Sequence, residues 1–228
     1  MVKRSGDEKP HNAEIDSLTH AGLLKTTTYL LNKGTLLHRI HHEQFAASQF
    51  NPGLQGNARF SPIQNAKGEP IPTLYAGMTK NCALMETVFH DVSFVPGLKT
   101  FDKSKLRQQV HSTLEIVENL KLVDLSSVAL RKLGITRKEL IDTEKDQYPI
   151  TRQWAAKLYQ QCPTAQGLAW VSRQDDTSRA LMLFGDRIPR LSLAQTGQSL
   201  SLINDATTYD GVLELAERLD VLIIPGKD

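Results

Sequence analysis

The chain has 228 residues, of which 40% are hydrophobic and 23% are charged, and this composition is typical of a soluble globular protein with one sizeable core or two small ones. Its 27 basic and 25 acidic residues nearly cancel to a formal net charge of +2, which argues against a large polyanionic partner such as DNA or an anionic membrane. The apolar runs are far shorter than the roughly 20 residues that span a bilayer, and the polar N-terminus offers no stretch for a secretory signal.

The N-terminal part of the chain is polar, and its predicted elements are short. Residues 1–14 are expected to form a solvated tail, and the spacing of the leucines in residues 15–31 predicts one or two short helices. An apolar run after a glycine predicts a strand over residues 34–40. We therefore expect an N-terminal segment, residues 1–33, followed by a single domain, residues 34–228.

The next stretch, residues 51–72, differs in composition from the rest of the chain. It holds four prolines and three glycines, which is 7 of the 24 Pro and Gly residues in about a tenth of the sequence. So many prolines and glycines in residues 51–72 exclude a regular helix or strand there. Because long ordered loops in compact domains are often functional, we expect this loop to contribute to a site.

Strands and helices are intermingled through the remainder of the chain without a regular βαβ order. Apolar or alternating runs predict strands at residues 73–77, 111–118, 120–125, 167–173, 179–184, 191–202 and 221–225. Helical spacing predicts helices at residues 81–91, 127–133, 136 onward, 150–161 and 209–219. Asn81 is the expected N-cap of the first helix, and Thr136 with Glu139 fits a capping box. The pattern predicts one α+β domain around a mixed or antiparallel sheet with surrounding helices.

The chain has two cysteines, Cys82 and Cys162, and no C-x-x-C spacing. Neither a zinc knuckle nor a redox pair is indicated, so we expect two free thiols rather than a disulfide. This usage favours a cytoplasmic protein.

Charged residues are scarce between residues 34 and 90, although this stretch includes the long loop. The stretch contains these seven: Arg39, Glu43, Arg59, Lys67, Glu69, Lys80 and Glu86. That is about half of what the chain-wide frequency would give. Loop-rich segments usually face water and are rich in charge. The few charged residues here therefore indicate a pocket in which they are functional.

Each of these residues also has an ordinary structural explanation. An arginine on a strand, such as Arg39, is commonly a surface residue, and one in a Gly/Pro loop, such as Arg59, commonly holds backbone carbonyls. A glutamate in the middle of a helix, such as Glu86, is usually solvated or, where buried, paired with an arginine. Tyr75 alone would be a core aromatic. The order of the residues along the chain is more specific than any one of them.

This order resembles the RES domain family, which is named for its Arg, Glu and Ser residues. The matching motifs are Arg39, Gly56-x-x-Arg59-Phe60-Ser61, Leu74-Tyr75-Ala76, Ala83-Leu84-x-Glu86-Thr87 and Ala169-Trp170-x-Ser172. The resemblance extends over residues 34–225 and is most specific over residues 36–90. It implies a fold similar to ADP-ribosyltransferase toxins and an activity that breaks the nicotinamide–ribose bond of NAD⁺. Ser178 is the competing candidate for the family serine.

The residue types suit this chemistry. Cleavage of the N-glycosidic bond passes through an oxocarbenium-like ribosyl cation and releases neutral nicotinamide, so one carboxylate near the ribose suffices, and Glu86 is expected to supply it. Arg39 and Arg59 could hold the diphosphate by bidentate hydrogen bonds. The expected catalytic residues are Glu86, Arg39 and Ser172, of which the serine would position a ribose hydroxyl or the amide.

The remaining expected binding residues are aromatic or imidazole groups. Tyr75 could present its ring face to the cationic nicotinamide, and Phe60 and His38 are expected to line the site. His38, His41 and His42 could be imagined as metal ligands, but no carboxylate or second histidine cluster stands at ligand spacing, so we expect no metal. The sequence has neither a dinucleotide-binding Gly motif nor a Walker A motif.

The resemblance implies a substrate, NAD⁺, rather than a bound cofactor, and leaves the acceptor open. Transfer of the ADP-ribosyl group to inorganic phosphate or water would make the protein an NAD⁺ phosphorylase or glycohydrolase, and transfer to a protein would make it an ADP-ribosyltransferase. A module that binds a nucleotide without turnover is a further alternative.

Family members are typically toxins partnered by an Xre-type antitoxin, so we expect an antitoxin that covers or enters the pocket. Contact with nucleic acid would then belong to the antitoxin, and we expect neither direct nucleic-acid binding nor membrane binding by this chain. A homodimer is left open.

Overall fold

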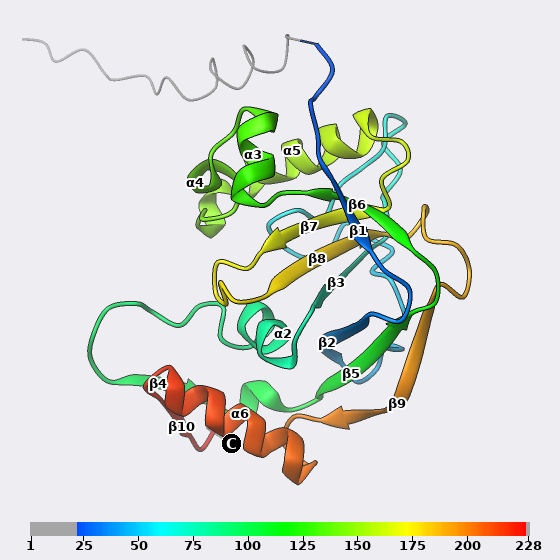
Figure 1. The fold of residues 1–228 in the computed structure, drawn as a ribbon. Helices are drawn as coiled ribbons and strands as arrows, with labels where there is room; N and C mark the ends of the chain where they lie inside the picture. The colour runs from blue at the N-terminus through cyan, green and yellow to red at the C-terminus, as the bar shows by residue number, and fades with distance from the viewer. Residues whose placement is uncertain (1–21, 227–228) are drawn as a thin grey trace, which may run out of the picture.

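The computed structural model describes residues 22–226, which form an eight-stranded sheet, a separate two-stranded sheet and the helices around them (Figure 1). The predicted tail, residues 1–14, lies outside the described residues. The strands are β1 Thr28–Leu31, β2 Leu36–His42, β3 Thr73–Gly77, β4 Lys99–Asp102, β5 Gln109–Ile116, β6 Leu120–Asp124, β7 Gly167–Val171, β8 Arg179–Phe184, β9 Leu193–Ser201 and β10 Val221–Ile224. The helices are α2 Lys80–Thr87, α3 Ser127–Leu133, α4 Arg137–Leu140, α5 Tyr148–Gln161 and α6 Ala206–Arg218, with short 3₁₀ helices η1 Lys103–Leu106 and η2 Lys145–Gln147.

The large sheet has the strand order β1-β6-β7-β8-β3-β2-β5-β9. Neighbouring strands pair antiparallel except β6 and β7, which are parallel, so the sheet is mixed. Within the described residues, β2 and β3 pair at a single register position, His38 opposite Gly77, whereas β2 and β5 pair along seven positions. The two halves of the sheet therefore meet at a narrow junction. This architecture confirms the predicted α+β fold around a mixed sheet.

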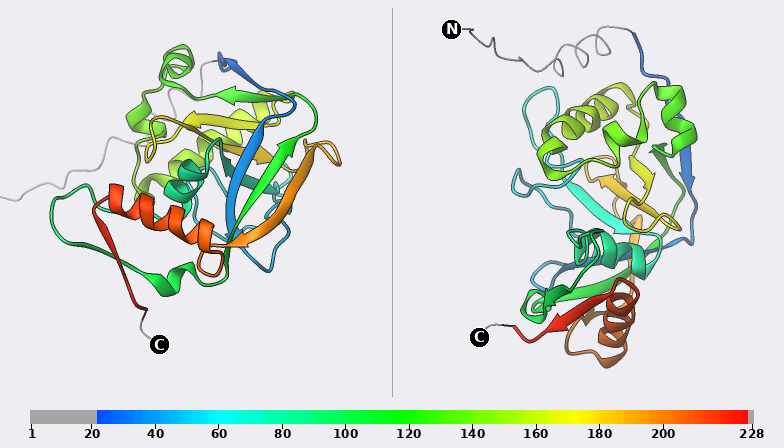
Figure 2. Two further views of the ribbon diagram at one scale, coloured as in Figure 1. Left: turned by 60° about the horizontal axis from the view of Figure 1, so that its bottom comes forward. Right: turned by 90° about the vertical axis from the view of Figure 1, so that its left-hand side faces the viewer.

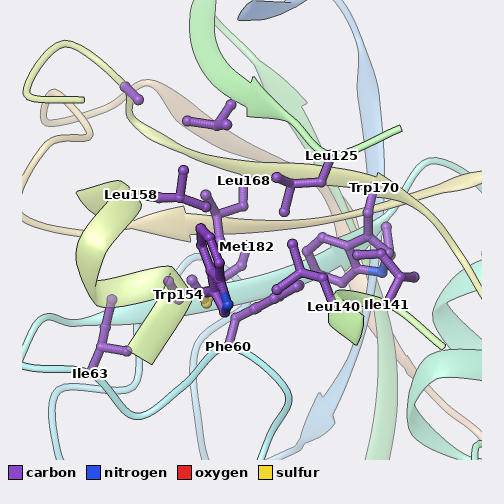
Figure 3. Packing of buried hydrophobic residues seen from close by; sticks show 14 of the residues in the cluster. Phe60, Ile63, Leu125, Leu140, Ile141, Trp154, Leu158, Leu168, Trp170 and Met182 are labelled. Carbon is purple, nitrogen blue, oxygen red and sulfur yellow. The ribbon is translucent and has the colours of Figure 1, made fainter. Parts of the chain in front are cut away.

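Helices α3, α4 and α5 cover one face of the sheet on the side of β6, β7 and β8 (Figure 1). Figure 3 shows side chains of this cluster, with Trp154 of α5 near Leu168 and Met182 of the sheet. The apolar stripe of α5 drives this packing, because Trp154, Ala155 and Leu158 repeat at helical spacing and are buried against Trp170 and Met182. A second cluster, which includes Leu37, Leu114 and Leu181, contains residues of both halves of the sheet. At the opposite end of the molecule, α2 and α6 pack with β4 and β10 around a third cluster (Figure 2).

The one or two helices predicted over residues 15–31 are wrong for residues 22–31, of which residues 28–31 form strand β1, and residues 15–21 lie outside the described residues. β1 pairs antiparallel with β6, its Leu31 is buried, and the Tyr29 ring lies 4.5 Å from the Arg179 guanidinium. These tertiary contacts outweigh the helical spacing of the leucines. The sheet therefore includes residues that precede the predicted domain start at residue 34.

The first helix after β3 is shorter than predicted and begins earlier. α2 ends at Thr87 rather than residue 91, and its N-cap is Thr79, whose side chain accepts a hydrogen bond from the Cys82 amide, instead of the predicted Asn81. The predicted capping box of Thr136 and Glu139 is confirmed at the start of α4. None of the helices within residues 22–226 is long and apolar enough to cross a membrane.

Candidate functional site

A cavity of about 340 Å³ lies beside the junction of the two half-sheets. Its walls come from β2, β3 and α2, from the loop that the glycines and prolines mark, and from the chain around η2. This loop has no helix or strand of its own, as predicted, and is held to β3 by a bridge between Asn51 and Thr73. The cavity is within the size range of small-molecule sites.

Glu86 is half-buried on α2 and lines the cavity. α2 starts directly at the end of β3 because Gly77 allows a close approach: a Cβ at that position would lie 2.7 Å from the Ala83 backbone nitrogen. Beside Glu86 on this helix, burial raises the pKa of the Cys82 thiol to about 12, and the Glu86 charge acts in the same direction. Cys82 is therefore a protonated core residue, and both cysteines are free.

The Ser172 hydroxyl donates a 2.6 Å hydrogen bond to Glu86 Oε1. Ser172 is fully buried, and its oxygen also accepts the backbone amides of Gln174 and Asp175, each at 3.0 Å. Ser178 instead interacts with the Thr79 hydroxyl at 3.3 Å, at the start of α2. The structure thus brings Ser172 rather than Ser178 to Glu86, in a place where the hydroxyl fixes the carboxylate.

Arg39 lines the cavity from β2 and holds the following turn. Its Nη1 donates to the carbonyls of Ala47 and Gln49 at 2.5 and 2.8 Å. Burial lowers the pKa of Arg39 to about 10, so the guanidinium still carries its charge at neutral pH. In the described part of the chain, the hydrogen bonds of this side chain all use Nη1.

Arg59 lies on the loop of residues 51–72 and is buried against the region that leads into α5. Its Nη1 donates to the carbonyl of Thr143 at 3.2 Å and also to the Thr143 hydroxyl, and its guanidinium lies 5.3 Å from the centre of the Tyr148 ring. Burial lowers the pKa of Arg59, while Tyr148 and then Glu86 act in the opposite direction. Arg59 is therefore a buried cation, and the negative charge of Glu86 stabilises its protonated form.

Tyr75 lines the cavity from β3, and two contacts fix its orientation. Its hydroxyl accepts the Phe60 amide at 3.1 Å, and its ring packs edge-on against Trp170 with centroids 6.1 Å apart. Burial raises the pKa of Tyr75, so the hydroxyl stays protonated. The Phe60 side chain is fully buried against Trp170, and it does not line the cavity. Phe60 is therefore corrected from a binding residue to a core residue.

The three histidines of β2 go to different places. His38 lines the cavity and pairs with His111 on β5, with Nδ1 and Nε2 2.9 Å apart and the rings stacked. His41 contacts the Ser112 hydroxyl at 2.8 Å, and His42 contacts the Gln108 side chain at 3.1 Å. Among residues 22–226 no three His, Cys, Asp or Glu side chains gather in a group that could hold a metal ion.

Four charged residues at the cavity were not predicted from the sequence, and they form two ion pairs. Arg173, next to Ser172, donates to the Thr143 carbonyl and forms an ion pair of 2.8 Å with Glu144. Lys145 forms an ion pair of 2.6 Å with Asp91. Position next to the family serine could have indicated Arg173, but no motif marks residues 125–165, from which the other wall of the cavity comes.

The arrangement combines a fixed carboxylate with buried guanidinium groups in one cavity. Such a set can bind a ligand that carries an anionic group at one end and a hydroxyl-bearing or cationic group at the other. A search of curated proteins gives no match to the chain. The family model of the RES domain matches residues 36–205, which is most of the sequence and includes every predicted site residue. The chain therefore belongs to the RES domain family, as its motifs indicated.

Proposed function

We propose that this RES domain protein is a toxin that cleaves the nicotinamide–ribose bond of NAD⁺ and passes the ADP-ribosyl group to inorganic phosphate or water. The observation that carries the proposal is the Glu86 carboxylate, held at 2.6 Å by the buried Ser172 hydroxyl inside a cavity that Arg39 and Arg59 also line. A carboxylate and two arginines are the groups that a cationic ribosyl centre and a diphosphate require.

Glu86 would act at the ribose. As the bond from the anomeric carbon to the nicotinamide nitrogen breaks, its electron pair leaves with the nicotinamide, which becomes neutral, and positive charge develops on the ribosyl ring. A carboxylate beside the ring stabilises this charge and can accept a hydrogen bond from a ribose hydroxyl. An oxygen of phosphate or water then forms the new bond to the anomeric carbon, and the proton that the attacking group loses passes to solvent.

Ser172 and the arginines would prepare the site for this step. Because the Ser172 hydroxyl already serves Glu86 and two backbone amides, it acts as a positioning residue that keeps the carboxylate in one orientation. Arg39 and Arg59 would hold the diphosphate, and the fixed ring of Tyr75 would pack against the nicotinamide. His38 would line the same site. No resident cofactor is required.

The test is to incubate the purified protein with NAD⁺, with and without inorganic phosphate, and to measure nicotinamide release. We expect release by the wild type, and a decrease of at least about a hundredfold in Glu86→Gln, because the stabilising charge is lost. Glu69→Gln is the matched control: Glu69 is an exposed loop carboxylate that bonds Asn65 and does not line the cavity.

The products separate the alternatives. ADP-ribose 1-phosphate indicates phosphorolysis, and ADP-ribose indicates hydrolysis. Label from NAD⁺ that ends on a macromolecule would replace the proposal with a protein ADP-ribosyltransferase. NAD⁺ that binds and stays intact under all conditions would replace it with a nucleotide-binding module.

An enzyme that drains NAD⁺ must be restrained in its host, so the proposal includes an Xre-type antitoxin that covers the cavity. Co-expression with the product of an adjacent helix-turn-helix reading frame should give a stable complex in gel filtration that releases no nicotinamide. Separate elution of the two proteins would contradict this part.

A further inference from the structure

Arg173 shares a hydrogen-bond acceptor with Arg59. Its Nη1 donates to the Thr143 carbonyl oxygen, which also accepts Arg59 Nη1 at 3.2 Å. Both side chains line the cavity and are largely buried, with the Arg173 side chain 14% exposed. Two guanidinium groups therefore converge on one neutral oxygen at the cavity wall.

This convergence brings two positive charges together. Burial lowers the pKa of Arg59, Tyr148 and Glu86 act in the opposite direction, and the charge of Arg173 lowers the pKa again. A carbonyl oxygen carries only a partial charge, so it orients the two arginines without neutralising them. An anion that accepts hydrogen bonds from both would relieve their repulsion and gain charge-assisted bonds.

The second partner of Arg173 is easily replaced. Its Nη2 is paired with Glu144 Oε1 at 2.8 Å, and the Glu144 side chain is 77% exposed. Exposed ion pairs contribute little because water competes for both groups. Arg59, in contrast, is bonded to the backbone and hydroxyl of Thr143. Glu144 thus accepts a hydrogen bond from Arg173 at the rim of the cavity, in an ion pair that water weakens.

The chain also fixes where Arg173 lies. The Ser172 hydroxyl accepts the amides of Gln174 and Asp175, so it shapes the turn that carries Arg173 while it holds Glu86. The Gln174 side chain donates to the His90 carbonyl at 2.9 Å and ties the same turn to the chain after α2. The turn that carries Arg173 is therefore tied both to Glu86 and to the chain after α2.

We propose that Arg173 completes an anion subsite with Arg59, and that an entering phosphate-class group displaces Glu144 from the Arg173 guanidinium. We assign this group to the diphosphate of NAD⁺, so the inference rests on the proposed function. Glu144 is then a competitor for the subsite, and its removal strengthens binding.

The test measures binding of ADP and, separately, of inorganic phosphate by titration calorimetry. Arg173→Gln should bind ADP about tenfold or more weakly, because a charged hydrogen-bond donor is lost. Glu144→Gln should bind ADP about two- to fivefold more tightly, because the competing carboxylate is gone. Arg152→Gln and Asp146→Asn are the matched controls: each removes the same charge near the site at a residue that does not line the cavity, and each should stay within about twofold of wild type.

The two substitutions are expected to change the ADP affinity in opposite directions, and this distinguishes a role in ligand binding from a structural role. If Glu144 only supported Arg173, Glu144→Gln would weaken ADP binding, and this result would overturn the proposal, as would wild-type ADP affinity in Arg173→Gln. Circular dichroism checks folding of each variant. If Arg173→Gln does not fold, Arg173→Lys, which keeps the charge but lacks the planar fork, should still bind ADP more weakly than wild type.

Two further comparisons identify which anion binds at the subsite. They also distinguish a failure of this inference from a failure of the proposed function. A change in ADP affinity in the Arg173 and Glu144 variants supports assignment of the anion to the diphosphate. A change only in the affinity for inorganic phosphate would overturn that assignment. Absence of NAD⁺ turnover together with ADP binding that depends on Arg173 refutes the proposed function alone. Normal turnover with an unchanged KM in Arg173→Gln refutes this inference alone.

Discussion

Ser172 shows how much of the site depends on one hydroxyl group. A serine hydroxyl has one donor and two acceptor positions, and in Ser172 the donor serves Glu86 while the oxygen accepts two backbone amides. The group is therefore fully used and has no position left for a substrate hydroxyl. The sequence-based expectation that Ser172 contacts the substrate changes into a role in holding Glu86 and shaping the turn before Arg173.

Ser172→Ala should lower kcat for nicotinamide release by about ten- to a hundredfold, while KM for NAD⁺ changes little. The reason is that the Glu86 carboxylate would lose its fixed orientation, whereas Arg39 and Arg59, the proposed diphosphate ligands, would be unchanged. Steady-state kinetics with NAD⁺ measures both constants. Ser178→Ala is the control, because Ser178 contacts Thr79 rather than Glu86. Equal losses of kcat in the two variants would count against the assigned role.

Helix α2 illustrates what the sequence could and could not predict at the scale of an element. Its apolar residues predicted a helix that contains Glu86, and the structure confirms this helix. Its cap and end were misplaced, because the Thr79 side chain competes with Asn81 for the capping position and only the structure shows which one bonds Cys82. β1 was missed because its partner β6 lies far along the chain. The same limit applies to Glu144 and Arg173, which tertiary packing brings to the cavity.

Gly77→Ala should lower the free energy of unfolding by about 2 kcal/mol, because the new methyl group would press on the backbone of α2. A Cβ at position 77 would lie 2.7 Å from the Ala83 nitrogen and 3.0 Å from Cys82 Cβ. Urea unfolding followed by tryptophan fluorescence measures the change. Gly53→Ala is the matched control, since the nearest atom to its Cβ is 3.9 Å away. A similar stability of the two variants would exclude this steric account of the β3–α2 junction.

At the scale of the whole molecule, the narrow junction between the half-sheets lies next to a cluster of basic groups. His38 and His111 are bonded across β2 and β5, and the charge of Lys80 on α2 acts on both. Burial, followed by His38 and Lys80, lowers the pKa of His111 to about 4. Burial and the nearby charge of Lys80 therefore disfavour protonation of both imidazoles in the folded protein.

Stability should consequently fall as the pH is lowered from 7 to 5. The unfolded chain binds a proton on His111 near its ordinary pKa of 6.5, but the folded chain does not until about pH 4, so protons favour unfolding throughout this window. His38 and His41 act in the same direction, because burial lowers their pKa values too. Carboxylates with lowered pKa values, such as Asp91, lose their contribution only below the window. Urea midpoints at pH 7 and pH 5 should differ less in His111→Gln than in the wild type, and an equal difference would show that other groups set the pH dependence.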